Sequence, residues 1–192
     1  MAEIIELEDV DSLGTGAVGE PGQRAFYIQA RTESAQLTVL VEKEQIALLA
    51  SEAVAFLDRI ADEFPEVPIA VLPAAAVLQE PTVPLFRARL IGLGFDPERE
   101  LVLIELRERP VDDGDDDGEG VGEADTFAAG GDAESLDVSD DEPGYVARIY
   151  ATRAQVRAMA ARGVDAVAGG RPPCPLCEQP MDPAGHACPR WN

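Results

Sequence analysis

Two short runs near the N-terminus have the composition and spacing of β-strands. Residues 25–30 and 37–41 are rich in β-branched and aromatic side chains, which favour strands. The connection over residues 31–35 is short and polar, so we expect the two strands to form a hairpin. A further short strand is expected at residues 4–7.

The longest helical pattern follows this hairpin. Apolar side chains recur at spacings of 3, 4, 4, 3 and 4 at Ile46, Leu49, Ala53, Leu57, Ile60 and Phe64. These spacings place the side chains on one stripe of a helix over about residues 43–64, and the stripe is expected to face a core. Pro65 and Pro68 end the helix. Residues 69–84 are apolar but interrupted by prolines, and at most a short helical turn is expected there.

A second hairpin and a second helix are expected in the C-terminal half. Residues 85–93 and 101–107 read as strands around a turn at 94–99. Polar side chains alternate with apolar ones and are expected to face water at Arg87, Arg89, Glu105 and Arg107. A strand over 145–150 precedes a helix that Thr152 and Gln155 begin as a capping box. Its expected buried side holds Val156, Met159, Ala160 and Val164, with Gly163 near its end.

These elements predict an α+β fold, in which two main helices pack on one face of an antiparallel sheet. Both halves of the chain read as strand, strand, helix. Residues 37–41 with the following Gln45, Ile46 and Leu49 resemble residues 145–150 with Gln155, Val156 and Met159. The sequence therefore indicates duplicated ββα units, although any amphipathic helix after a strand would look similar.

A glycine-rich stretch over residues 14–22 contains the pattern G-x-G-x-x-G. In a dinucleotide-binding fold a helix begins at this pattern and its N-terminus receives the pyrophosphate. Here Pro21 and Gly22 follow instead, and a strand comes next. A turn or flexible loop is therefore expected, without a cofactor.

Charge is distributed very unevenly over the 192 residues. The formal net charge is −22, and residues 112–142 hold fourteen acidic side chains and no basic one, which leaves −8 for the remainder. We expect this acidic stretch to be a disordered insertion. Asp113, Asp115 and Asp117 match the start of a calcium-binding loop, but the twelfth position is Ala124 and not the required Glu. The negative charge disfavours binding of nucleic acid.

Length and hydropathy complete the domain prediction. One α+β domain is expected over residues 1–168, with the acidic insertion at about 112–142, and a metal-binding tail over 169–192. No stretch approaches the roughly 20 apolar residues that span a bilayer, so no membrane contact is expected. The acidic N-terminus lacks the basic segment of a signal peptide, and we expect a cytoplasmic protein.

The tail contains all three cysteines and the only histidine of the chain. Cys174, Cys177, His186 and Cys188 have the spacing C-x2-C-x8-H-x-C. Two thiolates two residues apart can reach one ion, and tetrahedral coordination by Cys and His is what Zn²⁺ favours. Since four protein ligands leave no position for water, the predicted zinc site is structural. The alternatives are a redox dithiol at Cys174 and Cys177, which leaves the other two residues unexplained, or chance.

Zinc ligation would remove the histidine and every cysteine from catalysis. No catalytic residue and no other cofactor is therefore predicted. Arginines could form a pocket for an anion if several share a face, and the candidates are Arg87, Arg89, Arg107, Arg109, Arg148, Arg153 and Arg157. Ion pairing with neighbouring acids is the competing explanation for these arginines.

The two ends of the chain carry distinctive motifs over residues 15–30 and 171–192. Together they resemble an actinobacterial family of uncharacterised proteins of this length with a C-terminal zinc-ribbon-like motif, and the resemblance extends over nearly the whole chain. It implies no activity and no catalytic residue.

The sequence thus predicts a non-enzymatic binding or adaptor protein with a structural zinc site. Arg190 and Trp191 lie beside the metal ligands and could contact a protein partner or the domain itself, since Trp is favoured at contact centres. The alternative is an enzyme or binding protein for a phosphorylated or carboxylated small molecule. Nucleic-acid binding through the tail is the weakest alternative, because the local charge is near neutral.

Overall fold

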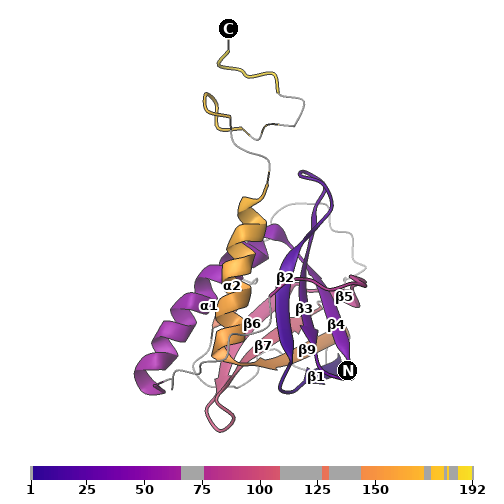
Figure 1. Ribbon diagram of the computed structural model, residues 1–192, viewed down its shortest axis with the longest axis vertical. Coiled ribbons are helices and arrows are strands. Elements are labelled where there is room, and N and C mark those ends of the chain that lie inside the picture. The colour runs from indigo at the N-terminus through magenta and orange to yellow at the C-terminus, as the bar shows by residue number, and fades with distance from the viewer. Residues whose placement is uncertain are drawn as a thin grey trace.

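The computed structural model describes residues 2–65, 76–108, 127–129, 144–170, 174–179, 181 and 186–191. The described residues form two helices and two mixed β-sheets (Figure 1). The α+β class predicted from the sequence is confirmed. None of the helices described is long and apolar enough to cross a membrane.

The first sheet has the strand order β2-β3-β4-β5. Its members are β2 (Ser12–Val18), β3 (Ala25–Arg31), β4 (Gln36–Val41) and β5 (Phe86–Arg87). The strands β2, β3 and β4 are antiparallel neighbours, while the short β5 pairs with β4 in parallel. The predicted hairpin of residues 25–30 and 37–41 is therefore present as β3 and β4.

The second sheet has the order β1-β9-β7-β6-β8. Its members are β1 (Ala2–Leu7), β9 (Gly144–Ala151), β7 (Leu101–Arg107), β6 (Leu90–Asp96) and β8 (Phe127–Ala129). The strands β6, β7 and β9 are antiparallel neighbours, and β1 and β8 add to the two edges in parallel.

Each helix begins two residues after a strand ends. These helices are α1 (Lys43–Glu63) and α2 (Arg153–Ala168), and they pack side by side (Figure 1). The predicted capping box of α2 is present, since Thr152 N–H donates to Gln155 Oε1 at 2.8 Å and Gln155 N–H donates to Thr152 Oγ1 at 3.2 Å. Gly163 lies inside α2 rather than near its end. A Cβ on it would come within 3.1 Å of Ile46 Cγ2, so glycine permits the close approach of the two helices.

The two halves of the chain have the same order of elements. The series β1-β2-β3-β4-α1 is repeated as β5-β6-β7-β9-α2, with β8 inserted before β9. In each half three antiparallel strands lead into the helix, and the first strand joins the sheet of the other half in parallel. The structure thus contains a repeated unit, as the sequence indicates, but the unit is larger than ββα.

One pair of glutamines shows how closely the halves correspond. Gln45 and Gln155 are both the third residue of a helix. Gln45 Nε2 donates to Ala88 O at 3.4 Å, and Gln155 Nε2 donates to Val10 O at 2.6 Å. Ala88 and Val10 each lie between the exchanged first strand and the second strand of a half. Each glutamine therefore connects its own helix to the other half of the chain through a hydrogen bond.

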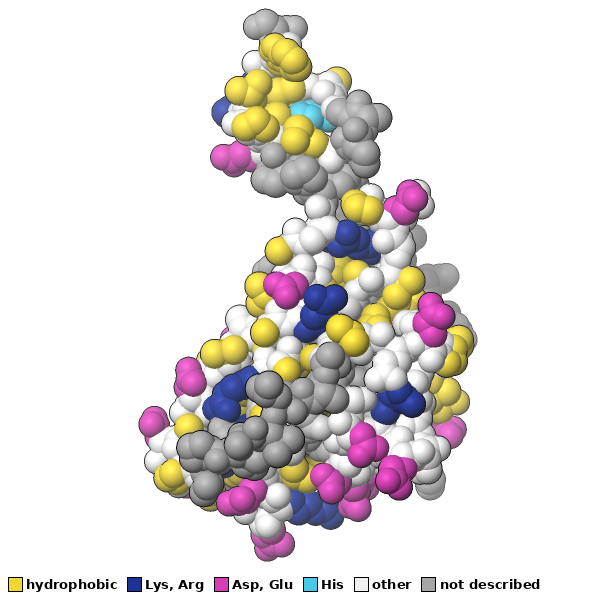
Figure 2. All heavy atoms as spheres, viewed as in Figure 1, with side chains coloured by type: hydrophobic (Ala, Val, Ile, Leu, Met, Phe, Trp, Pro, Cys, Tyr) yellow, Lys and Arg dark blue, Asp and Glu magenta, His cyan; other side chains and the backbone are white. Residues whose placement is uncertain are grey.

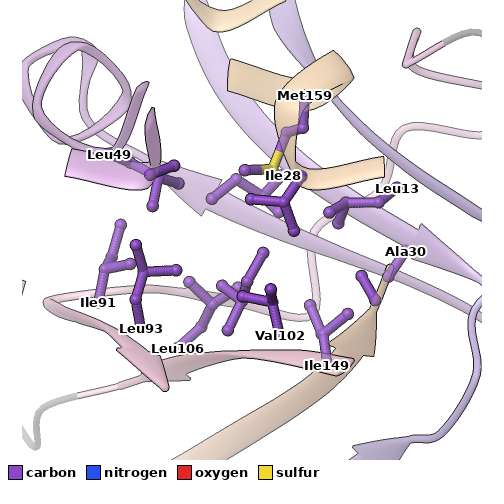
Figure 3. Packing of buried hydrophobic residues seen from close by; sticks show 14 of the residues in the cluster. Leu13, Ile28, Ala30, Leu49, Ile91, Leu93, Val102, Leu106, Ile149 and Met159 are labelled. Atoms are coloured by element: carbon purple, nitrogen blue, oxygen red, sulfur yellow. The ribbon is translucent and has the colours of Figure 1, made fainter. Parts of the chain in front are cut away.

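Side chains from both sheets and both helices meet in one core (Figure 3). Its members include Leu13, Ile28, Ala30, Ile91, Leu93, Val102, Leu106, Ile149, Leu49 and Met159. The predicted stripe of α1 faces this core, with five of its members buried and Phe64 partly buried. Val164 of α2 is 58% exposed, so the prediction that it is buried is wrong.

The single antiparallel sheet expected from the sequence is replaced by two mixed sheets. The run 85–93 was predicted as one strand, but it breaks after Arg87. Residues Phe86–Arg87 pair with β4, and Leu90 begins β6 in the other sheet. Local hydrophobic patterns do not show which sheet a strand joins. The sequence therefore does not predict that β1 and β5 each pair with the sheet of the other half.

Two expectations about polar and glycine-rich positions are confirmed only in part. Arg87 and Arg89 are exposed as expected. Glu105 and Arg107 are only 2% and 4% exposed, although their alternation with apolar neighbours predicts a face in contact with water. In the glycine-rich stretch, residues 14–18 belong to β2, and the expected turn before the next strand is limited to residues 19–22. A Cβ on Gly14 would lie 2.8 Å from Val77 O, so glycine here lets the segment over 76–79 lie against the strand.

The acidic insertion falls mostly outside the described residues. Within 112–142 the structure describes residues 127–129 only, which form β8 and pair with residues 91–93 of β6. A strand at this place differs from the expected segment without regular structure. The calcium-like positions 113–124 and residues 66–75 lie outside the described part of the chain. Residues 76–84 contain no helix.

Candidate metal centre

The first two cysteines lie at the ends of a tight turn. Cys174 N–H donates to Gln179 O at 2.8 Å, and Glu178 N–H donates to Cys174 O at 2.8 Å. Glu178 follows Cys177 with a φ of 62°, a left-handed conformation that favours glycine. The turn thereby holds the side chains of Cys174 and Cys177 on the same side of the chain.

The four predicted ligands come together at one point. The donor atoms of Cys174, Cys177, His186 and Cys188 all lie within 4.8 Å of one another. Cys174 Sγ and Cys188 Sγ are 3.9 Å apart, and Cys177 Sγ lies 3.2 Å from His186 Nε2. Zn–S bonds of about 2.3 Å in a tetrahedron put sulfur atoms about 3.8 Å apart. The four residues are therefore close enough to bind one metal ion.

Local hydrogen bonds distinguish the first two thiols. Cys174 is buried, and the backbone N–H groups of Cys177 and Leu176 lower its pKa, the latter from 3.4 Å. At Cys177 the backbone N–H of Gln179 lowers the pKa of the thiol. Burial and the neighbouring Cys174 and Cys188 raise this pKa by a larger amount in total, so the net change is upward. The lowered pKa of Cys174 favours its thiolate, which is the form of cysteine that binds metal.

The end of the tail is fastened to the cysteine turn. Arg190 Nη1 donates to Leu176 O at 3.1 Å, and Trp191 N–H donates to Cys188 O at 3.0 Å. Figure 2 shows hydrophobic side chains gathered beside the single histidine on this part of the surface. Leu176 is 48% exposed and Trp191 is 80% exposed, so both present apolar surface next to the candidate metal ligands.

The arginines singled out in the sequence do not form one pocket. Arg107 Nε and Arg148 Nε contact the carboxylate of Glu105 at 2.7 and 2.8 Å. Arg153 Nη1 donates to Phe64 O at 2.6 Å at the end of α1. Arg89 and Arg157 are exposed, and Arg109 lies outside the described residues. Ion pairing with acids, the competing explanation, accounts for Arg107 and Arg148.

A different set of basic residues does line a cavity. The cavity has a volume of about 500 Å³ and lies where the start of α1 meets the end of α2; we call it the α1/α2 cavity. Arg24, Lys43 and Arg87 line it together with Glu42. Of these three basic residues, only Arg87 is among the arginines that the sequence suggests for an anion pocket. No motif in the sequence joins these residues, because they belong to three separate segments of the chain.

Comparison with known proteins gives one match. The protein family described as "Protein of unknown function (DUF3090)" matches this chain over residues 5–188, a range that includes all four metal-binding candidates. No curated protein and no solved structure matches the chain.

Proposed function

We propose that this chain, which belongs to the DUF3090 family of proteins of unknown function, is a non-enzymatic binding or adaptor protein with a structural zinc site. The observation that carries the proposal is the convergence of four donor atoms within 4.8 Å. Three sulfur donors and one imidazole are a set that suits Zn²⁺, since thiolates bind it well in tetrahedral sites.

The number of ligands argues for a structural rather than a catalytic ion. Catalytic zinc sites have three protein ligands and leave one position for water or substrate. Here Cys174, Cys177, His186 and Cys188 would occupy all four positions. A tail of this size buries too little apolar surface to fold alone, so metal binding would supply most of its folding free energy.

Elemental analysis of the purified protein tests the zinc assignment. We expect one zinc per chain in the unmodified protein and less than a tenth of that in Cys177→Ser. The matched control is Gln179→Ala, because the exposed Gln179 side chain lies in the same turn and offers no ligand. Zinc bound equally well by Cys177→Ser, or another metal in the unmodified protein, would contradict the assignment.

The surface next to the metal ligands supports an adaptor role. Trp191 and Leu176 are exposed beside the ligands, and the hydrogen bonds given above for Arg190 and Trp191 join tail residues to one another. A large aromatic side chain with an apolar neighbour is typical of contact centres. The tail would thus be a rigid support that holds Trp191 towards a protein partner.

Chemical cross-linking in native extract tests the adaptor role. We expect a specific partner that is recovered with the unmodified chain and lost with Trp191→Ala, while zinc content stays at one per chain. Val83→Ala is the control, since Val83 is 71% exposed but lies in the body of the protein. Recovery of the same proteins with Trp191→Ala would show that the tail is not the contact surface.

A further inference from the structure

The α1/α2 cavity has the features of a ligand site that is separate from the metal centre. Its volume of about 500 Å³ is typical of small-molecule sites, which span roughly 300–1,000 Å³. We propose that it binds a small molecule that carries a phosphate monoester next to an apolar portion. Three observations carry this proposal: the charge of the cavity, its apolar wall, and its filled counterpart in the other half of the chain.

The cavity is positively charged in a protein whose formal net charge is −22. Arg24, Lys43 and Arg87 face a single acid, Glu42. Arg87 forms an ion pair with Glu42. Among the residues that the structure describes, the side chains of Arg24 and Lys43 have no ion pair or hydrogen bond. The net charge of +2 complements a dianion such as a phosphate monoester.

Arg24 and Lys43 reach the same end of the cavity. Arg24 Nη1 lies 3.2 Å from the place that a Cβ on Gly169 would take, and Lys43 Nζ lies 3.9 Å from that of Gly170. The two glycines at the end of α2 therefore leave room in which the cations converge. A helix C-terminus attracts cations by itself, and the experiment below separates that role from ligand binding.

The equivalent place in the other half of the protein is filled. Arg153 begins α2 as Lys43 begins α1, but its side chain is buried and donates to Phe64 O at 2.6 Å. Its guanidinium lies 4.7 Å from the ring centroid of Phe95, and the rings of Phe64 and Phe95 are 5.1 Å apart. The rings of Phe64 and Phe95 and the guanidinium of Arg153 thus occupy the space between the end of α1 and the start of α2.

The half with the cavity has small residues at the two positions equivalent to Phe95 and Phe64, and the aromatic side chain in its wall is that of Phe26. Phe95 pairs with Val102 across β6 and β7, and Ala17 pairs with Phe26 across β2 and β3, so Ala17 stands where Phe95 stands in the other half. At the helix ends, the C-cap residues are Phe64 for α1 and Gly169 for α2. Small residues thus replace two rings next to the cavity, since Ala17 is the ladder partner of the lining residue Phe26 and Gly169 lies between the lining residues Ala168 and Gly170.

The rest of the wall specifies the second part of the ligand. Apolar residues of β3, β4 and the end of α2 line the cavity: Ala25, Phe26, Leu40, Val41, Val167 and Ala168. The planar guanidinium of Arg24 suits phosphate oxygens through paired N–H donors. An apolar wall beside a dicationic end therefore fits a phosphate ester of an apolar group better than free phosphate.

The only lysine of the chain makes this proposal directly testable. Reductive methylation with ¹³C leaves the charge of Lys43 in place and gives one side-chain NMR signal, which the Lys43→Arg variant identifies by its loss. Phenyl phosphate is the probe, with phenol and succinate as comparison ligands. We expect a saturable shift of the Lys43 signal with phenyl phosphate, and at least about tenfold weaker binding of phenol and succinate.

Three variants separate ligand binding from structural roles. Arg24→Gln should weaken phenyl phosphate binding about tenfold or more, and Gly170→Phe should do so by filling the cavity while its charges remain. Arg162→Gln is the control, since Arg162 is an exposed arginine elsewhere on α2, and it should bind like the unmodified protein. Absence of a saturable shift, equal binding of succinate, or equal weakening by Arg162→Gln would overturn the proposal.

Discussion

Gln29 on β3 and Glu105 on β7 occupy equivalent positions in the two halves. Both side chains are buried, but they form different polar contacts. Gln29 pairs opposite Thr38 on β3 and β4, as Glu105 pairs opposite Arg148 on β7 and β9. Gln29 Nε2 donates to Thr38 Oγ1 at 3.0 Å and to Gln79 O at 2.9 Å, while Gln79 N–H donates back to Gln29 Oε1 at 2.8 Å. The Gln29 amide thereby holds the connecting segment at Gln79 against β3. Glu105, at the equivalent position, forms ion pairs with Arg107 and Arg148 instead.

Removal of the Glu105 carboxylate should destabilise the fold strongly. It accepts hydrogen bonds from Arg107 and Arg148 at 2.7 and 2.8 Å and is only 2% exposed. Glu105→Ala would leave two guanidinium groups without this partner, and losing one member of a buried ion pair costs about 3–5 kcal/mol. Urea unfolding measures the change. The exposed Glu33→Ala should change stability by less than about 0.5 kcal/mol, and a similarly small loss for Glu105→Ala would refute the expectation.

The left-handed residue in the cysteine turn gives a second expectation at this scale, which rests on the proposed zinc site. Glu178 has a φ of 62°, and a non-glycine residue in that conformation costs about 1 kcal/mol. Glu178→Gly should therefore bind zinc about fivefold more tightly, as measured by competition with a chromophoric chelator. Gln179→Gly, at a neighbouring position without positive φ, should bring no gain. Equal affinities in the two variants would show that the turn is unstrained.

At the scale of elements, the glycines of β2 decide how closely a connecting segment approaches. A Cβ on Gly14 would lie 2.8 Å from the backbone oxygen of Val77, whereas one on Gly16 would meet only the side chain of Leu78 at 3.2 Å. A backbone atom can move only with its segment, but a leucine side chain can change rotamer. The same pattern that resembled a nucleotide-binding loop thus serves packing.

Gly14→Ala should cost more stability than Gly16→Ala. The first substitution pushes the backbone at Val77 and weakens the nearby hydrogen bonds between Gln29 and Gln79, with an expected loss of about 1–3 kcal/mol. The second requires only movement of Leu78 and should cost less than about 1 kcal/mol. Thermal unfolding of both variants measures the difference. The reverse order of stability would mean that the segment over 76–79 adapts more readily than the Leu78 side chain.

At the scale of the whole molecule, a body with one core precedes a tail with its own set of internal contacts. The core joins both sheets and both helices, while the described tail has hydrogen bonds between Cys174 and Gln179, and between Arg190 and Leu176. Because these contacts lie within each part, we expect the stability of the body not to depend on an ion bound in the tail.

Removal of the proposed zinc ion should therefore unfold the tail and leave the body folded. Trp191 is the only tryptophan, so its fluorescence reports on the tail, while far-ultraviolet circular dichroism reports mainly on the body. Chelation should change the Trp191 signal, and the thermal midpoint of the body should shift by less than about 2 °C. Acidification should act like the chelator, because cysteine binds the ion only as thiolate and acid protonates the thiolates. A large fall of the body's midpoint on chelation would show that tail and body are coupled.

The sequence by itself determined the features that depend on neighbours along the chain. Helical periodicity located α1 and the start of α2, strand composition located β1, β3, β4 and β9, and the capping box at Thr152 is present as predicted. The ligand spacing from Cys174 to Cys188 also sufficed to single out the cluster, because a turn of a few residues and a short loop bring its donors together. In all these cases the decisive contacts are local.

The tertiary structure alone decided the features that depend on distant segments. The exchange of β1 and β5 between the halves, the burial of Glu105 and the opening of the α1/α2 cavity all follow from which strands and helices become neighbours. Alternation along a strand shows that it has two faces, but not what covers each face. Arg24, Lys43 and Arg87 meet only after a strand from one half has paired with the sheet of the other.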